Sequence, residues 1–424
     1  MIALLGCAPL LAQQRFAAAD WPTYNRDLEG TRFSPLTQIN TENVAGLQPV
    51  WSYALGQNAT TGELGGGSQF TPLVIDGVMY LAGPDHVVAL NAATGAQLWR
   101  FNVRQGEPSR RGLAYWPGGD DYSPMVLITV SQLLVGILPQ EQRSTLRAMP
   151  VLYLGAPVIF EHLMLVGSNG PPGSVRAFDL RDGSQAWVFH STPGPGEPGH
   201  ETWESDAWAE QNHLYHWAFS LTVDAQRGLV FAAFESAGPS DYYGGDRPGD
   251  NLFSDSIVAL DVRTGERRWH FQTVHHDLWD FDLPAAPGLL DVEINGETVP
   301  ILALAGKTGY LYILNRETGE PVFGIEERAV PRSNVPGEQS SPTQPIPVKP
   351  PPIAKVDFSP ADIVTAADTT EAHARFCRSV YEASGGFFNA GPFTPYMVRE
   401  AGSAPQSTIV FPGSMGGANW GGTA

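Results

Sequence analysis

Short hydrophobic runs, separated by clusters of Gly, Pro, Asn and Asp, recur along the whole chain. This pattern is typical of β-strands joined by tight turns rather than of long helices. One unit occurs four times: an apolar run, Asp or Asn, two residues, Thr or Asp, Gly, three residues and then Trp. The copies span residues 87–101, 175–189, 257–271 and 311–323. We expect each copy to form a β-hairpin.

Each position of this repeat has a physical reason. Asp or Asn starts the turn by accepting backbone N–H groups, and Gly supplies a positive φ. The following strand carries Trp99, Trp187 or Trp269 at an equivalent place, whereas the fourth copy has Pro321 and Val322 there, which weakens its docking. An equivalent Trp in successive sheets is typical of radially arranged blades. The sequence therefore predicts an all-β fold, a β-propeller.

Three regions depart from the repeat. Residues 125–138 form an apolar run that is too short and too polar to span a membrane, and we expect a buried strand there. No docking repeat is found at 121–150, so one blade should be divergent. A helical pattern follows Ser359 and Pro360, which would cap and begin the helix, and a glycine pair at 385–386 would end it.

Composition and charge exclude several classes of function. The 424 residues include 46 Gly and 36 Pro, and the net charge is −19. Such a chain has no basic surface for nucleic acid, so no nucleic-acid partner is expected. The sequence has no HExxH motif, Cys/His cluster, P-loop, GxSxG or GxGxxG in a βαβ context. Zinc chemistry, nucleotide binding through these motifs and serine hydrolysis are therefore disfavoured.

The N-terminus resembles an export signal. Residues 1–12 are apolar, and three alanines at 17–19 offer a cleavage site. We expect an export segment at 1–19, a single functional domain at 20–424 and a periplasmic location. The sequence around Cys7 also resembles a lipoprotein cleavage box, which would make the protein membrane-associated. No transmembrane span is expected.

Several blocks, in order, resemble the pyrroloquinoline quinone (PQQ)-dependent dehydrogenases, the quinoproteins. Besides the repeat, which resembles their tryptophan-docking motif, the blocks are RRGLAYWP (110–117), TWESDAW (202–208), RPGDN (247–251), TVHHDLWDFDLPA (273–285), AGKTGYLYILNRETG (305–319) and VFPGSMGGANWGG (410–422). The residues in these blocks are more similar to the glucose dehydrogenase branch than to the methanol branch. The resemblance implies an eight-bladed propeller, expected to be incomplete here because family members continue beyond the last block.

The resemblance also implies an activity and its partners. A glucose-like aldose or an alcohol would be oxidised by hydride transfer to PQQ, with Ca²⁺ or Mg²⁺ as a second cofactor. A respiratory quinone or a cytochrome would accept the electrons. PQQ is a flat quinone with three carboxylates, so its pocket needs an aromatic floor, cations and a nearby base.

Individual residues take roles from the same resemblance. Asp277 matches the catalytic base, which also contacts the metal, and Lys307 matches the cation at the quinone oxygens. The other cofactor-binding candidates are Arg111, Asn169, Gly170, Trp217, Asn419 and Trp420. The other metal candidates are Asn169 and Ser236, because Pro172 falls near the place of a calcium-binding glutamate of the methanol branch.

A non-catalytic or inactive propeller scaffold that keeps the docking repeats is the alternative. A scaffold has no reason to retain Asp277, Lys307 and Arg111 together. The enzyme is therefore the favoured interpretation.

Overall fold

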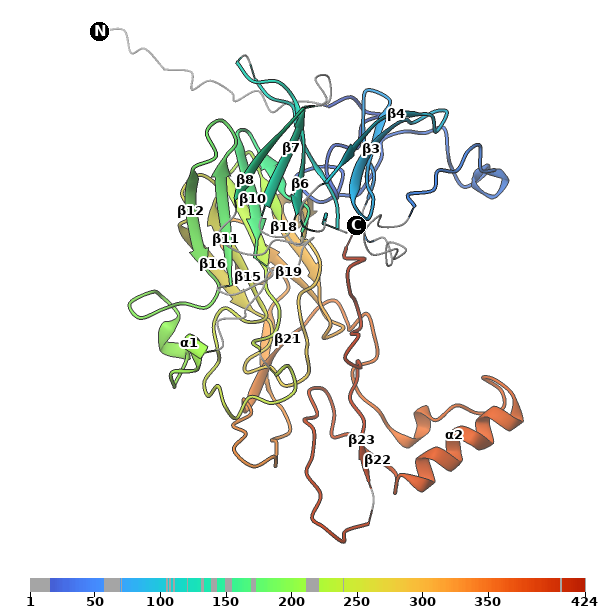
Figure 1. Cartoon of the computed structure of the whole chain (residues 1–424). Helices are drawn as coiled ribbons and strands as arrows, with labels where there is room; N and C mark the ends of the chain where they lie inside the picture. The colour runs from blue at the N-terminus through green and yellow to red at the C-terminus, as the bar shows by residue number, and fades with distance from the viewer. Residues whose placement is uncertain are drawn as a thin grey trace.

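The computed structural model describes most of the chain between residues 16 and 423. The residues outside this description are 1–15, 57–68, 70, 104–105, 107, 110, 120, 131–132, 139–142, 149–154, 169–172, 211–220, 239, 405 and 424. Most of the expected export segment therefore lies outside the described residues. The remainder is mainly β-structure, with successive antiparallel sheets arranged side by side (Figure 1).

Within the described residues, four sheets have four antiparallel strands each, paired in sequence order. The first contains β1 (Leu73–Ile75), β2 (Val78–Ala82), β3 (His86–Asn91) and β4 (Gln97–Asn102). The second contains β5 (Ala114–Trp116), β6 (Met125–Val130), β7 (Leu133–Leu138) and β8 (Arg143–Ala148). The third contains β9 (Val158–Phe160), β10 (Leu163–Gly167), β11 (Ser174–Asp179) and β12 (Gln185–His190). The fourth contains β13 (Thr222–Asp224), β14 (Leu229–Ala233), β15 (Ser256–Asp261) and β16 (Arg267–Gln272).

Smaller elements complete the described part. A three-stranded sheet contains β17 (Gly288–Ile294), β18 (Glu297–Ala305) and β19 (Leu311–Asn315). Two-stranded sheets are formed by β20 (Ile325–Ala329) with β21 (Thr343–Pro347) and by β22 (Phe387–Phe388) with β23 (Ser407–Thr408). The helical segments are η1 (Val44–Gly46), η2 (His200–Thr202), α1 (Ala207–Glu210), η3 (Pro360–Asp362) and α2 (Glu371–Ala383).

The hydrophobic core lies between neighbouring sheets. One cluster joins Val175 of β11 to Val230 of β14 and Val258 of β15, and another joins Phe231 of β14 to Leu302 of β18. Because each sheet buries both faces against its neighbours, the hydrophobic runs are continuous rather than alternating. This is the packing of propeller blades, as the repeat predicts.

The repeat tryptophans connect one blade to the next. The indole N–H of Trp187 donates to the carbonyl of Val262 at 3.0 Å, and its ring lies against Gly265, where a Cβ would approach it to 2.6 Å. Trp269 lies in the same way against Gly319. Each of these glycines also has a positive φ, +73° and +78°. The repeat glycine therefore serves both the turn and the neighbouring tryptophan.

Two further observations extend this docking pattern. Trp51, which is not part of a repeat, packs on Gly95 of the first copy and donates to the carbonyl of Ala92 at 3.2 Å. In the fourth copy the sheet ends at β19 within the described residues, and on its outer side a single bridge joins Leu314 to Pro321. The loss of the Trp motif at this copy thus coincides with the loss of its outer strand.

The region at 121–150 is a blade despite lacking the repeat. β6 pairs with β7 and β7 pairs with β8, from Val126 opposite Ile137 to Leu138 opposite Arg143. The expectation of one strand at 125–138 is therefore wrong, because this apolar run is a hairpin of two strands. The polar pair Ser131-Gln132 interrupts the run in the sequence, between Val130 at the end of β6 and Leu133 at the start of β7.

The helix begins later than the sequence pattern indicated. Ser359 and Asp362 form a capping box around the short η3 turn only. α2 begins after Thr370, whose hydroxyl accepts the N–H of His373 at 3.2 Å. Both segments carry valid start signals, so the capping residues alone could not decide between them. None of the described helices is long and apolar enough to cross a membrane.

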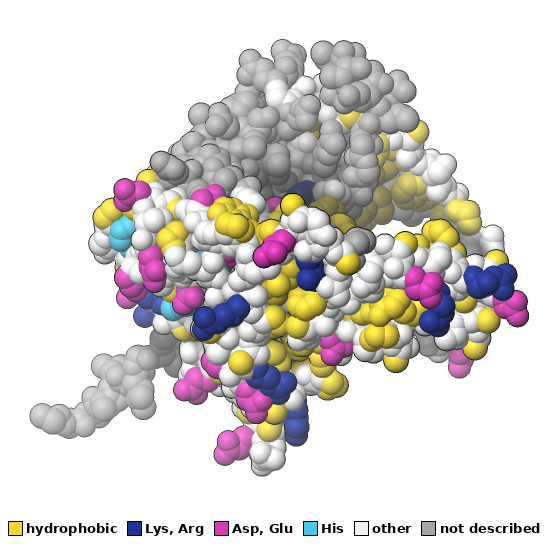
Figure 2. Space-filling view, turned by 90° about the horizontal axis from the view of Figure 1, so that it is seen from below, with side chains coloured by type: hydrophobic (Ala, Val, Ile, Leu, Met, Phe, Trp, Pro, Cys, Tyr) yellow, Lys and Arg dark blue, Asp and Glu magenta, His cyan; other side chains and the backbone are white. Residues whose placement is uncertain are grey.

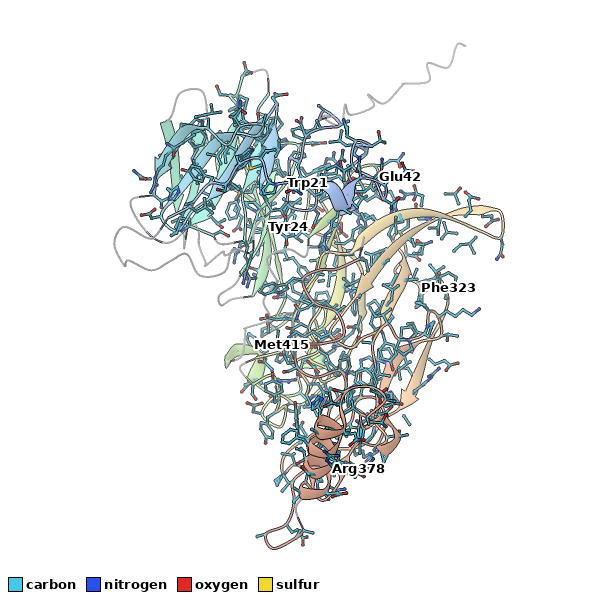
Figure 3. The ribbon with its side chains drawn as sticks, turned by 90° about the vertical axis from the view of Figure 1, so that its right-hand side faces the viewer. Trp21, Tyr24, Glu42, Phe323, Arg378 and Met415 are labelled. Atoms are coloured by element: carbon cyan, nitrogen blue, oxygen red, sulfur yellow. The ribbon has the colours of Figure 1, made fainter. Side chains whose placement is uncertain are left out.

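The segments after β19 extend away from the blades, with α2 at their far end, and the end of the chain returns to the blades (Figures 1 and 3). Large hydrophobic residues are exposed there, namely Phe323, Val348, Ile353, Phe376 and Met415. Figure 2 shows this end of the molecule, where hydrophobic side chains lie exposed between acidic and basic ones. These segments add surface to one end of the blades.

Candidate active site

The candidate site centres on the irregular segment between β16 and β17. Here His276 and Asp280 have φ values of +45° and +61°. Such residues interrupt the alternation of a strand, so Asp277, Asp280 and Asp282 point into different surroundings although they are close in sequence. Their environments decide their roles.

The carboxylate of Asp277 is fully enclosed. One oxygen accepts the N–H of Trp279 at 3.0 Å, and the other accepts the N–H of Phe281 at 2.8 Å and the hydroxyl of Ser236. Burial raises the pKa of Asp277, and these three hydrogen bonds act in the opposite direction. Asp277 therefore holds the turn together, and no solvent-facing lone pair is apparent.

Asp280 has a different environment. Its carboxylate is partly exposed and lies 2.8 Å from the ammonium of Lys307, which is also 2.7 Å from Asp282. Burial and the charge of Asp282 raise the pKa of Asp280 to about 7, against the lowering effect of Lys307. Burial lowers the pKa of Lys307, but Asp282 and Asp280 outweigh it and hold that pKa above its usual value. The site thus contains an accessible carboxyl group with a pKa near 7 beside an ammonium that stays protonated.

Hydrogen bonds connect the two halves of this site. The N–H of Ser236 donates to Asp282 at 2.8 Å, while its hydroxyl donates to Asp277. Behind them, the buried guanidinium of Arg247 donates to the carbonyl of Asp277 at 2.6 Å. One continuous network therefore runs from Arg247 through Asp277, Ser236 and Asp282 to Lys307.

The adjacent histidines do not share a partner. His275 lies 3.1 Å from the carboxylate of Glu327. His276 lies 2.9 Å from Glu338 and 2.8 Å from the carbonyl of Gly249. They attach the segment to different neighbours.

The last described residues lie against the same site. Gly416 packs on the backbone of Lys307, and Gly417 donates to its carbonyl at 2.9 Å. The guanidinium of Arg111 lies over the ring of Trp420, 5.2 Å from its centroid. Arg111 also interacts electrostatically with Glu235, the neighbour of Ser236. Arg111, Trp420 and Lys307 are therefore brought to one region.

Asn419 uses its amide within its own turn. Its nitrogen donates to the carbonyl of Met415 at 2.9 Å, and its oxygen accepts the N–H of Trp420 at 2.9 Å. Its predicted contact with the cofactor stays a prediction. Asn169, Gly170 and Trp217 lie outside the described residues, and their roles stay predictions as well.

Of the predicted metal ligands, Asp277 and Ser236 are among the described residues and Asn169 is not, so their shared role stays a prediction. No group of three or more His, Cys, Asp or Glu side chains that could hold an ion is found in this part of the chain. The Ser236 hydroxyl and the Asp277 carboxylate are hydrogen-bonded to each other.

The described residues do fit a quinone that carries carboxylates. Arg111 is a half-buried guanidinium, and burial lowers its pKa, so an anion placed beside it would be favourable there. Trp420 offers an aromatic surface under that guanidinium, and Lys307 offers an ammonium. These are the aromatic and cationic groups that PQQ requires.

Sequence reasoning did not assign Asp280, Asp282 or Arg247. All three stand inside blocks already singled out, RPGDN and HHDLWDFDLP. The signal in the sequence was the presence of Asp280 and Asp282 close to Asp277, but spacing does not rank these carboxylates. Their solvent exposure in the structure shows that Asp280 is the most accessible.

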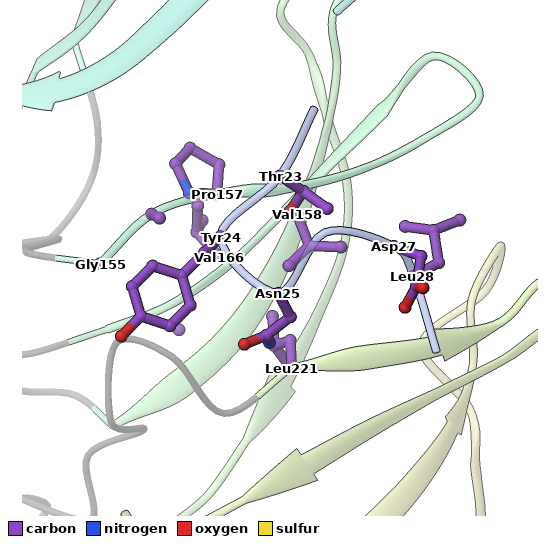
Figure 4. Close-up of a pocket in the computed structure, with 12 residues that line it drawn as sticks. Thr23, Tyr24, Asn25, Asp27, Leu28, Gly155, Pro157, Val158, Val166 and Leu221 are labelled. Atoms are coloured by element: carbon purple, nitrogen blue, oxygen red, sulfur yellow. The ribbon is translucent and has the colours of Figure 1, made fainter. Parts of the chain in front are cut away.

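A pocket lies beneath the N-terminal segment (Figure 4), and Tyr24 in its wall interacts electrostatically with Arg111. It is lined by Thr23, Tyr24, Asn25, Asp27, Leu28, Gly155, Ala156, Pro157, Val158, Val166, Gly167 and Leu221. The hydroxyl of Tyr24 points away from Asp27. The segment itself is fixed to the blades by Val223, which donates to the carbonyl of Leu28 at 2.7 Å, and by Leu289, which donates to Glu29 at 2.9 Å. None of the carboxylates described above lines this pocket.

Known proteins show the same organisation. The quinoprotein glucose dehydrogenase of Escherichia coli (strain K12) is 30% identical over 98% of this chain and 55% of its own length. The quinate/shikimate dehydrogenase (quinone) of Acinetobacter baylyi (strain ATCC 33305 / BD413 / ADP1) is 29% identical over 96% of this chain and 54% of its own length. The chain thus spans about half the length of these relatives.

Structural comparison agrees. The quinohemoprotein alcohol dehydrogenase from Comamonas testosteroni superposes with a TM-score of 0.63 and 26% identity, over 78% of this chain and 52% of that one. The model of the PQQ glucose/ethanol/alcohol dehydrogenase β-propeller domain matches residues 21–141 and 132–424. Together with the docking tryptophans and the Asp–Lys site, these matches confirm the predicted family: the chain belongs to the PQQ-dependent dehydrogenase β-propeller family.

Proposed function

We propose that this protein is a PQQ-dependent oxidoreductase that oxidises a glucose-like aldose or an alcohol. The observation that carries the proposal is the ion pair between Asp280 and Lys307, at 2.8 Å, on a partly exposed surface. A structural ion pair gains nothing from a carboxyl whose pKa is near 7, whereas a base that must both accept and release a proton does.

Asp280 is the base in this proposal, in place of Asp277. A base has to reach the substrate hydroxyl, and Asp277 has its oxygens occupied by three donors inside a closed turn. Asp280 keeps one oxygen on Lys307 and has the other near Tyr242 at the surface. Asp277 positions the turn that presents Asp280.

Lys307 stabilises negative charge in this site. Its pKa is held above the usual value, so it stays protonated and cannot act as a base. A fixed cation next to developing negative charge is usually a large contribution to catalysis. Asp282, held by the N–H of Ser236, keeps the ammonium in place.

Arg111, Trp420 and Lys307 would hold the cofactor. Bound PQQ would supply the acceptor for the hydride that leaves the substrate carbon. The chain's own part is to bind carboxylate at Arg111, to offer the ring of Trp420 and to move the hydroxyl proton to Asp280.

Export to the periplasm and a respiratory quinone or cytochrome as electron acceptor are parts of the same proposal. They are supported by the N-terminal sequence and by the family. The divalent ion, Ca²⁺ or Mg²⁺, is likewise proposed from the family alone.

The test is to load the purified chain with PQQ, with and without Ca²⁺, and to follow dye reduction with a panel of sugars and alcohols. Asp280→Asn is the matched control, because it keeps the shape and loses the base. Substrate-dependent reduction that Asp280→Asn abolishes supports the proposal. Stoichiometric PQQ binding without reduction of dye by any substrate would favour the scaffold.

A further inference from the structure

Two exposed tyrosines stand beside the proposed base. Tyr242 precedes β15, and Tyr396 lies in the segment between β22 and β23. Their ring centroids are 5.9 Å apart with an interplanar angle of 84°. The side chains are 45% and 36% exposed, so each ring keeps an open surface.

The pair is coupled directly to the site. The hydroxyl of Tyr242 lies 3.3 Å from a carboxylate oxygen of Asp280, the oxygen not used by Lys307. Tyr396 interacts electrostatically with Tyr242 and with Asp280. Burial, followed by the charge of Asp280, raises the pKa of Tyr242, so its hydroxyl stays protonated and able to donate. The two rings thus border the place where a substrate hydroxyl would meet its base.

Carboxyl groups flank the same rings. Asp241, next to Tyr242, is half-buried, and its pKa is raised by burial and by the charge of Asp282. A solvent-exposed aromatic surface with hydrogen-bonding groups at its edge suits a ligand that has both apolar C–H faces and hydroxyl groups around them. A sugar ring has this character. A two-carbon alcohol offers a much smaller apolar face than a sugar ring.

We infer that Tyr242 and Tyr396 form the surface that receives the ring of a cyclic polyhydroxy substrate, and that they direct the enzyme toward aldoses over short alcohols. The inference rests on the proposed function, because it takes Asp280 as the reacting base. It adds the residues that set the substrate class.

The first test compares kcat/KM for glucose and for ethanol in the PQQ-loaded protein. Tyr396→Ala should lower the glucose-to-ethanol ratio by about 3- to 10-fold, the usual size of one aromatic contact. Tyr396→Phe keeps the ring and should keep the ratio. Tyr122→Ala is the matched control, since Tyr122 is 41% exposed and pairs with one ring, Trp116, away from the site.

A second test needs no cofactor. Saturation-transfer NMR on the unloaded protein should show magnetisation passing from aromatic protons to the ring C–H protons of glucose. Tyr396→Ala should reduce this transfer, and Tyr122→Ala should not.

The outcomes distinguish the sugar-binding role of the tyrosines from the proposed dehydrogenase activity. A ratio and a transfer signal that Tyr396→Ala leaves unchanged overturn the inference while the dehydrogenase stands. Glucose transfer that depends on Tyr396 in a protein without any oxidation keeps the sugar surface and overturns the proposed activity. Loss of the ratio in Tyr396→Phe as well would also overturn the inference, because the ring would then not be the cause.

Discussion

The substitution Asp277→Asn separates a structural carboxylate from a catalytic one. Asparagine keeps the shape of Asp277 but retains one acceptor oxygen. In its better orientation that oxygen still serves Phe281 and Ser236, and the amide nitrogen then faces the N–H of Trp279. One buried N–H is left without an acceptor, which costs about 1–3 kcal/mol of unfolding free energy. We therefore expect a loss of about 2 kcal/mol.

The assay is urea unfolding of the protein without cofactor, followed by tryptophan fluorescence. Asp280→Asn is the matched control: Asp280 is partly exposed, and Lys307 keeps Asp282 as its partner, so the change should stay below about 1 kcal/mol. In the PQQ-loaded protein Asp280→Asn should have the larger effect on activity, lowering kcat by about 10²–10⁴-fold. An Asp277→Asn protein that unfolds like the parent yet has lost turnover would refute this reasoning and return the base to Asp277.

Three further outcomes are expected. The kcat/KM of the loaded protein should rise with pH through about 7, because Asp280 must be deprotonated to accept a proton, and a flat profile from pH 5 to 9 would contradict this. Lys307→Ala should lower kcat by about 10²–10³-fold, weaken PQQ binding and move the pH limb upward, because the cation that lowers the pKa of Asp280 is gone. Gly265→Ala should lower the free energy of unfolding by about 2–5 kcal/mol, because its Cβ would meet Trp187 at 2.6 Å at a positive φ. Gly77→Ala, which has a similar φ and open space around it, should lower it by about 1–2 kcal/mol. Equal losses in urea unfolding would show that the tryptophan contact adds nothing.

The repeat could be predicted because its physics is local. A turn of Asn91 or Asp261 accepts backbone N–H groups two and three residues ahead, and Gly95 or Gly265 follows with a positive φ. Both requirements lie within one hairpin, so the residue types and their spacing in the sequence are enough to predict the turn. The partners of Trp187 and Trp269 are glycines of other hairpins, and no local pattern states which ones.

The blade at 121–150 could not be identified from the local repeat. Its strands β6, β7 and β8 pair as the other blades do, yet the turn between β7 and β8 lacks the repeat. A blade needs paired strands and a packed face, and the docking motif is an addition to both. Counting motifs therefore undercounts blades: the described part has five sheets of three or more strands, whereas the repeat has four copies.

The site shows the same limit at the scale of a single turn. In a strand, residues 277 and 280 would face opposite sides, and the sequence would then tell which one reaches the cofactor. In this segment Asp280 itself adopts φ +61°, so the turn can enclose Asp277 and still direct Asp280 outward to Lys307. The resemblance located the block, and the exposure and charged neighbours of each carboxylate support the proposed choice between them. In this proposal a family motif places the catalytic base to within a turn, and the solvent access of each carboxylate indicates which residue performs the chemistry.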